Sequence, residues 1–280
     1  MTAKPIVAAT DGSEHSLQAV EWAAAESVLR GAPLRIVSAA ATLRRMSAGP
    51  SGEKLENVTD VLHQNRDQGL AAAAARAAAA APGLQIDTEV ITGAPADAVA
   101  DSGSGALMLV VGSRGAGAFT ALVFGSVSRY VASNASCPVV VVRDAPPSPH
   151  QLVGIGLSDL DTCAEALTFG FEEAALRKAS LTVMHAWEAP PGSGRPNVEE
   201  ESRKQLTGFL DSWRSKYPDV NVSQDVVHGH PARALVGLSA RADLVVIGRH
   251  ARHGRPPGPG AVRHAVLNHA HGPVAVVPSA

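Results

Sequence analysis

The stretch LVVGSRGAG, residues 109–117, joins a short run of apolar residues to a turn that is rich in glycine. An apolar run of this length, ended by glycines, is typical of a strand buried in a parallel sheet. Similar runs alternate with helical patterns along the chain, and this alternation is the pattern of βαβ units. The stretch and its surroundings therefore predict the α/β fold class.

The chain repeats this order of elements, which indicates a duplication. Five segments of the first half recur in the second half in the same order. Chance similarity between apolar runs would not preserve the order of five elements, so we interpret the chain as two copies of one domain. The matching segments are 17–28 and 164–175, 34–39 and 181–186, 93–96 and 229–232, 109–112 and 244–248, and 138–142 and 273–277.

A proline-rich segment separates the two halves. Three prolines within 144–150 cannot continue a helix or a sheet ladder, so we expect a short stiff linker there. The domains would then span 1–143 and 151–280. The alanine-rich tract 71–81 is expected to end a long helix, because alanine is the best helix former. In the first domain we expect strands near 4–10, 33–39, 84–91, 106–112 and 138–143, and helices near 13–30, 53–81, 94–103 and 126–135.

Composition argues against several classes of protein. The formal net charge is -2 and charged residues make up 18% of the chain, which disfavours nucleic-acid binding through bulk electrostatics. No segment has the pattern of a signal peptide or of a membrane span, so we expect a cytoplasmic protein without a membrane partner. Cys137 and Cys163 lack metal-type spacing and are expected to be reduced structural thiols. Eight of the eleven histidines lie from His185 onward, and surface histidines explain this enrichment more simply than a metal site.

The glycine-rich turn and the helix that follows it form a candidate phosphate site. Glycines let a ligand approach the backbone closely, and a helix start offers unpaired N–H groups and a positive dipole end. The helix is expected to open at Gly125, with Ser126 and Ser128 as further hydroxyl donors. The alternative is a flexible glycine-rich loop in which Ser126 is an ordinary N-cap. The turn is not a Walker A loop, because no Gly-Lys-Ser/Thr follows it.

Asp11 ends the first predicted strand, in the sequence Thr10-Asp11-Gly12-Ser13. Ligands of doubly wound sheets bind beyond the carboxyl ends of the strands, where the winding direction reverses. If the first and fourth strands are neighbours, Asp11 and the glycine-rich turn face one crevice. Asp11 would then help to hold Mg²⁺ or hydrogen-bond the nucleoside. The alternative is that Asp11 only caps the helix that starts near Ser13.

These residues resemble the motif of the universal stress protein family, in its ATP-binding branch. The motif is Gly, two residues, Gly, nine residues, Gly and then Ser or Thr, which Gly112, Gly115, Gly125 and Ser126 match. The resemblance implies two tandem doubly wound domains, each a five-stranded parallel sheet in the order 3-2-1-4-5 flanked by four helices. It also implies ATP with probable Mg²⁺ at Asp11, and adenine against the backbone of Ala39. The implied ligand-binding residues are Thr10, Asp11, Gly12, Ala39, Gly112, Ser113, Arg114, Gly115, Gly125, Ser126, Val127 and Ser128.

The second half departs from this motif. Asp11 corresponds to Ser158, Ser126 to Ala261, and the second motif glycine to Ala251. The sequence therefore predicts that the second domain has lost part of its nucleotide site. Its remaining candidate residues are Ser158, Ala186, Gly248, Arg249, Gly260, Ala261 and Val262.

The sequence favours a regulatory protein of the stress response that binds ATP, with at most slow ATP hydrolysis. One rival is an enzyme that uses adenine nucleotides, but the turn offers Arg114 and hydroxyls rather than an activating lysine. The other rival is a scaffold that binds no nucleotide. In the family order, the runs 139–142 and 274–277 are edge strands, so we expect them to pair within the chain. A homodimer is a further expectation.

Overall fold

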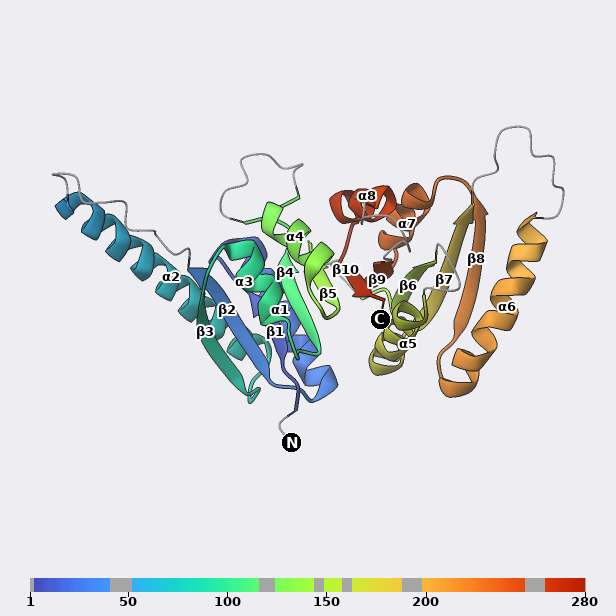
Figure 1. Cartoon of the computed structure of the whole chain (residues 1–280). Helices are drawn as coiled ribbons and strands as arrows, with labels where there is room; N and C mark the ends of the chain where they lie inside the picture. The colour runs from blue at the N-terminus through green and yellow to red at the C-terminus, as the bar shows by residue number, and fades with distance from the viewer. Residues whose placement is uncertain are drawn as a thin grey trace. The chain divides into compact units, whose positions relative to one another are not determined.

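The computed structural model describes residues 3–40, 52–115, 124–143, 149–157, 163–187, 198–249 and 260–279, with side chains from 64 in the second helix and from 199 in the sixth. The chain divides into two compact units, Met1–Val142 and Arg143–Ala280 (Figure 1). Each unit is described by itself below.

In the first unit, strands alternate with helices from the first element to the last. The apolar strands are short and the helices amphipathic, as βαβ units require. The elements are β1 (Ile6–Ala9), α1 (Glu14–Arg30), β2 (Leu34–Ala40), α2 (Gly52–Ala80), β3 (Ile86–Thr92), α3 (Pro95–Ser102), β4 (Met108–Gly112), α4 (Ser126–Asn134) and β5 (Val139–Val142).

The second unit repeats this order. Its elements are β6 (Leu152–Leu157), α5 (Ala164–Arg177), β7 (Ser180–Trp187), α6 (Val198–Lys216), β8 (Val222–His228), α7 (Pro231–Ser239), β9 (Leu244–Arg249), α8 (Ala261–His269) and β10 (Val274–Pro278). The predicted α/β class with parallel sheets is confirmed, since all described strand pairs within each unit are parallel.

The strands of the first unit lie in the order β3-β2-β1-β4-β5, and those of the second in the order β8-β7-β6-β9-β10. Successive crossovers run outward from β1 through β2 to β3, and then from β4 to β5 on the other side. Because such crossovers are right-handed, α1 and α2 lie on one face of the first sheet, and α3 and α4 on the other. The winding direction therefore reverses between β1 and β4, which pair directly from Ile6↔Met108 to Ala8↔Val110.

The core of each unit is aliphatic, as the low aromatic content predicts. In the first unit β1, β4 and β5 are almost fully buried. Cys137 of this unit and Cys163 of the second unit are both buried, as expected of structural cysteines. The predicted end of the long second helix at the alanine-rich tract is found, because α2 ends at Ala80. In the described part of the chain, no helix combines the length and the apolar character that a membrane span needs.

Candidate functional site

The carboxyl ends of β1 and β4 bring Asp11 and the glycine-rich turn together. A Cβ placed on Gly115 would lie 2.5 Å from Oδ2 of Asp11, so this carboxylate rests against the backbone of the turn. Any side chain larger than hydrogen at Gly115 would displace Asp11. The two residues were predicted to face one crevice if β1 and β4 were neighbours, and the structure has them in contact.

The Asp11 carboxylate holds the start of α1 through Ser13. Oδ1 of Asp11 accepts hydrogen bonds from the Ser13 backbone N–H at 3.0 Å and from the Ser13 hydroxyl at 2.6 Å. Ser13 itself is the N-cap of α1, where its side chain accepts from the N–H of Ser16. Asp11 is therefore not the helix cap of the alternative interpretation. It orients the capping residue and still lies exposed at the edge of the sheet.

A buried pair of hydroxyls makes the Asp11 turn rigid. Oγ1 of Thr10 lies 3.0 Å from Oγ of Ser16, and it accepts the N–H of Gly12 at 3.1 Å. Gly12 has a φ of 79°, a left-handed conformation that glycine adopts without strain. The backbone N–H of Thr10 also donates to the carbonyl of Val37 in β2. Asp11 is thus presented by a turn with little freedom of its own.

The glycine-rich turn is tied together at its two ends. The hydroxyl of Ser128 donates to the carbonyl of Gly112 at 2.6 Å, and the N–H of Gly125 donates to the carbonyl of Ser113 at 2.9 Å. The start of α4 is therefore fastened to the end of β4. Ser128 is buried and its proton is already donated, so in this geometry it positions the helix start. Residues 116–123, between these two ties, lie outside the described residues.

The first turn of α4 keeps backbone donors at the carboxyl edge. Its N-cap is Gly125, which provides no side-chain hydrogen bond, so the alternative in which Ser126 caps the helix is not found. Ser126 is the first helical residue and is exposed, and Val127 is half-buried. An uncapped helix start of this kind favours an anion through its N–H groups and its dipole.

Ala39 and Arg114 complete the set of predicted residues in the first unit. Ala39 lies near the end of β2, half-buried and opposite Ile91 of β3. Arg114 is half-buried between the two ties of the turn. All twelve predicted ligand-binding residues of this unit thus lie at or next to the carboxyl edge of the sheet, near the reversal between β1 and β4. The sequence analysis missed the supporting residues Ser13 and Ser16, although the Ser-x-x-Ser spacing before a helical stripe is an N-cap signal.

The second unit places its remaining candidates at the equivalent edge. Gly248 and Arg249 end β9, Ala186 lies near the end of β7, and Gly260 is the N-cap of α8, which begins with Ala261 and Val262. Ser158 and Ala251 lie outside the described residues.

Two further differences distinguish this edge from that of the first unit. Arg263 follows Gly260 at the spacing at which Ser128 follows Gly125, so an arginine stands where the first unit has its hydroxyl tie. Burial lowers the pKa of Arg263 from its ordinary value. At the ends of β7 and β8, the rings of Trp187 and His228 lie 4.6 Å apart. This aromatic pair was missed by the sequence analysis.

Protein side chains alone do not form a metal site in the described part of the chain. No group of three or more His, Cys, Asp or Glu residues there could hold a metal ion. Mg²⁺ is commonly bound through one or two carboxylates together with substrate phosphates. Asp11 fits that mode, since it is one exposed carboxylate beside a candidate phosphate site.

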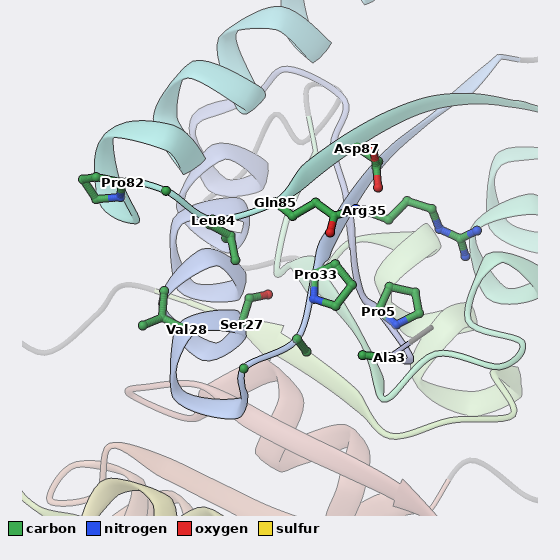
Figure 2. Close-up of a pocket in the computed structure, with 13 residues that line it drawn as sticks. Ala3, Pro5, Ser27, Val28, Pro33, Arg35, Pro82, Leu84, Gln85 and Asp87 are labelled. Atoms are coloured by element: carbon green, nitrogen blue, oxygen red, sulfur yellow. The ribbon is translucent and has the colours of Figure 1, made fainter. Parts of the chain in front are cut away.

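A separate cavity of about 710 Å³ lies at the opposite edge of the first sheet, near the amino ends of β1, β2 and β3. Figure 2 shows Val28 and Ser27 of α1 on one side of it and Leu84 on the other, with the Arg35 side chain extending away from both. The guanidinium of Arg35 donates to the carbonyl of Ser102 at 2.7 Å and lies 3.7 Å from Oε2 of Glu89. The walls of this cavity are mainly proline and aliphatic side chains, and the Arg35 guanidinium on its wall is already bound to Ser102 and Glu89. The cavity therefore does not have the convergent polar groups found around Asp11.

Comparison with known proteins shows that the chain contains two copies of one family's domain. The model of the Universal stress protein family matches residues 2–143 and 150–278. Universal stress protein Rv1996 of Mycobacterium tuberculosis is 33% identical over 298 residues, covering 97% of this chain and 94% of its own length. A universal stress protein of Mycolicibacterium smegmatis is 32% identical over 260 residues, covering 89% of this chain and 88% of its own.

A solved structure agrees with these matches at the level of the fold. The crystal structure of a universal stress protein from Archaeoglobus fulgidus has a TM-score of 0.76 to this chain, covers 99% of both chains and is 16% identical.

Proposed function

Because the chain belongs to the universal stress protein family, we propose that it is a regulatory protein of the stress response whose first unit binds ATP. The observation that carries the proposal is the contact of Asp11 with Gly115 beside an uncapped helix start. It brings together a carboxylate, the backbone of a glycine-rich turn and the N–H groups of a helix start, at the position where the winding of the sheet reverses. Such an edge is the usual ligand site of a doubly wound sheet.

Each part of the edge has a distinct role in the proposal. The N–H groups at Ser126 and Val127 bind the phosphates, with help from the dipole of α4. Gly115 lets the phosphate chain approach the backbone of the turn, and Gly112 lets the first turn of α1 pass over the end of β4. Asp11 bonds a ribose hydroxyl or joins the phosphates in holding Mg²⁺. The backbone of Ala39, near the end of β2, meets the adenine ring.

The protein is proposed to act through binding rather than turnover. Phosphoryl transfer needs a positioned nucleophile or base and concentrated positive charge on the transferred group. Around the turn, the described side chains supply Arg114, serines and a carboxylate that is already hydrogen-bonded to Ser13. We therefore assign ATP hydrolysis at most a slow side reaction, and we place the regulatory effect in a conformation or an interface that a partner recognises.

The second unit is proposed to bind nucleotide weakly or not at all. The counterpart of Ser126 is Ala261, and the Ser128 tie is replaced by Arg263. We further propose that β5 and β10 pair within one chain, that the protein forms homodimers, and that it resides in the cytoplasm. Hydrogen exchange at the amides of 139–142 and 274–277 tests the strand pairing, because unpaired edge amides would exchange rapidly.

Ligand-linked melting tests the proposed function. A site occupied at 100 times its dissociation constant adds roughly 2.7 kcal/mol of stability, so Mg-ATP should raise the melting temperature of the wild type. Asp11→Ala should lose most of this increase. Asp87→Ala is the matched control, because it removes an exposed carboxylate at the opposite edge of the same sheet and should keep the increase. Equal increases in the Asp11 and Asp87 variants, or none in the wild type, would contradict the proposal.

A further inference from the structure

Helix α2 touches the Asp11 turn through a contact between two glycines. A Cβ on Gly69 would lie 3.1 Å from Cα and 3.5 Å from N of Gly12, and a Cβ on Gly12 would lie 3.3 Å from Cα of Gly69. The two backbones therefore meet without an intervening side chain. Because Gly12 directly follows Asp11 and has a positive φ, a displacement of Gly12 is transmitted to Asp11.

Two turns further along α2, Arg76 binds the start of α1. Its Nη1 and Nη2 each lie 3.0 Å from one carboxylate oxygen of Glu14, and its Nε lies 2.6 Å from Oε1 of Glu21. This is a bidentate fork on Glu14 with a second carboxylate at the remaining donor, a geometry that lysine cannot reproduce. The hydrogen bond from Arg76 lowers the pKa of Glu14, and the bonds to Glu21 and Glu14 raise that of Arg76.

The helix face between these two contacts is packed on the unit. Leu70, Ala73 and Ala77 are buried on α2, one or two turns apart. Alanines at this face let neighbouring elements approach closely, and α2 is in contact with α1 and with strands β2 and β3. The alanine-rich tract therefore forms the packed face of α2, and this part of α2 is held against the rest of the unit.

We infer that α2 positions the Asp11 turn, with Gly69 and Arg76 as positioning residues for the nucleotide site. The inference rests on the function proposed above and adds the element that regulates the site. Gly69 contacts the backbone of the Asp11 turn at Gly12. Arg76 holds the first residue of α1, which lies three residues after Asp11. Since coupling between sites is reciprocal, a nucleotide held by Asp11 also holds α2 in place, and a partner that displaces α2 weakens nucleotide binding.

Gly69→Ala separates positioning from simple stability. The higher helix propensity of alanine offsets part of the crowding against the Gly12 backbone, so the unliganded melting temperature should change little. The added Cβ pushes on Gly12, so the dissociation constant of Mg-ATP, measured by calorimetry, should increase at least about fivefold. Gly208→Ala in α6 is the matched control, since a Cβ there meets nothing within 4 Å, and it should bind as the wild type does.

Arg76→Gln provides a second variant that does not depend on helix packing. Arg66→Gln is its control, because Arg66 lies on the same helix, pairs with the exposed Asp67 and loses the same charge. The attraction of ATP to the overall charge therefore changes equally in both. Arg76→Gln should raise the dissociation constant at least about threefold over Arg66→Gln, and Arg76→Lys should recover only part of the loss.

Amide resonances of Gly12 and Ser13, recorded without ligand, distinguish the inference from the function on which it rests. They should shift in Gly69→Ala and stay in place in Gly208→Ala. If they shift but the wild type does not bind Mg-ATP, the proposed function is wrong and the positioning by α2 stands. The inference is overturned if the wild type binds Mg-ATP and both Gly69→Ala and Arg76→Gln bind it as tightly as the wild type does. It is also overturned if the resonances do not move in Gly69→Ala.

Discussion

At the scale of single residues, the candidate site depends on glycines that backbone atoms crowd. A Cβ on Gly112 would lie 2.7 Å from the carbonyl oxygen of His15 and 3.0 Å from the N of Ser16, so the first turn of α1 passes directly over the end of β4. A Cβ on Gly115 would meet Asp11 instead, which is a side chain and can move. The motif glycines therefore have different tasks. Gly112 is needed for folding, and Gly115 for the placement of the carboxylate.

Gly112→Ala should lower the free energy of unfolding by about 2 kcal/mol, because backbone atoms cannot yield to the new methyl group. Urea unfolding monitored by circular dichroism measures the change. Gly237→Ala in α7 is the control, since a Cβ there meets nothing within 4 Å and should leave stability unchanged or slightly higher. Unchanged stability of the Gly112 variant would show that α1 does not pass as close to β4 as the structure has it.

At the scale of elements, three contacts between elements hold the candidate site of the first unit in place. β1 leads into the Asp11 turn, which the Thr10 and Ser16 hydroxyls make rigid. β4 is tied to α4 by the Ser128 hydroxyl. α2 is clamped to α1 through Arg76. Each fastening joins two elements, so the site is a property of their packing rather than of the glycine-rich turn alone.

The clamp between α1 and α2 should weaken in acid. The folded-state pKa of Glu14 is below its ordinary value, so its contribution to stability is present above the ordinary pKa of a glutamate and is lost as the pH falls through the lowered value. The protection factors of the α2 amides from 64 to 80, which correct for the slower intrinsic exchange in acid, should fall over that range. In Arg76→Gln this pH-dependent fall should be absent at these amides, because the partner that lowers the pKa of Glu14 is gone. Identical pH profiles in both proteins would contradict this account of the clamp.

At the scale of the whole molecule, duplication has produced two units with the same strand order and different residues at the carboxyl edges of their sheets. In the first unit, β2 ends at Ala40 and β3 at Thr92, and these two residues lie opposite each other in the sheet. The corresponding partners in the second unit are Trp187 and His228, whose rings are in contact. The second edge therefore has bulk at the strand ends and an arginine in place of the hydroxyl tie, so the two units are not expected to bind one ligand equally.

Calorimetry should find one ATP bound per chain. Two bound ATP molecules per chain would require both units to bind the nucleotide. The second unit lacks the counterparts of Ser126 and Ser128. Asp11→Ala should then abolish the binding heat rather than halve it. Two sites of equal affinity in the wild type would show that the altered residues of the second unit do not matter for binding.

The duplication, the α/β class and the grouping of Asp11 with the glycine-rich turn follow from the sequence by itself. They rest on local periodicity, which short stretches of sequence show, and on the rule that parallel strands end at one edge of the sheet. The contact of Gly69 with Gly12, the Arg76 fork on Glu14 and the pairing of Trp187 with His228 were decided only by the tertiary structure. These contacts join residues that are far apart in the chain, and their geometry depends on how the helices and strands pack, which residue spacing does not encode.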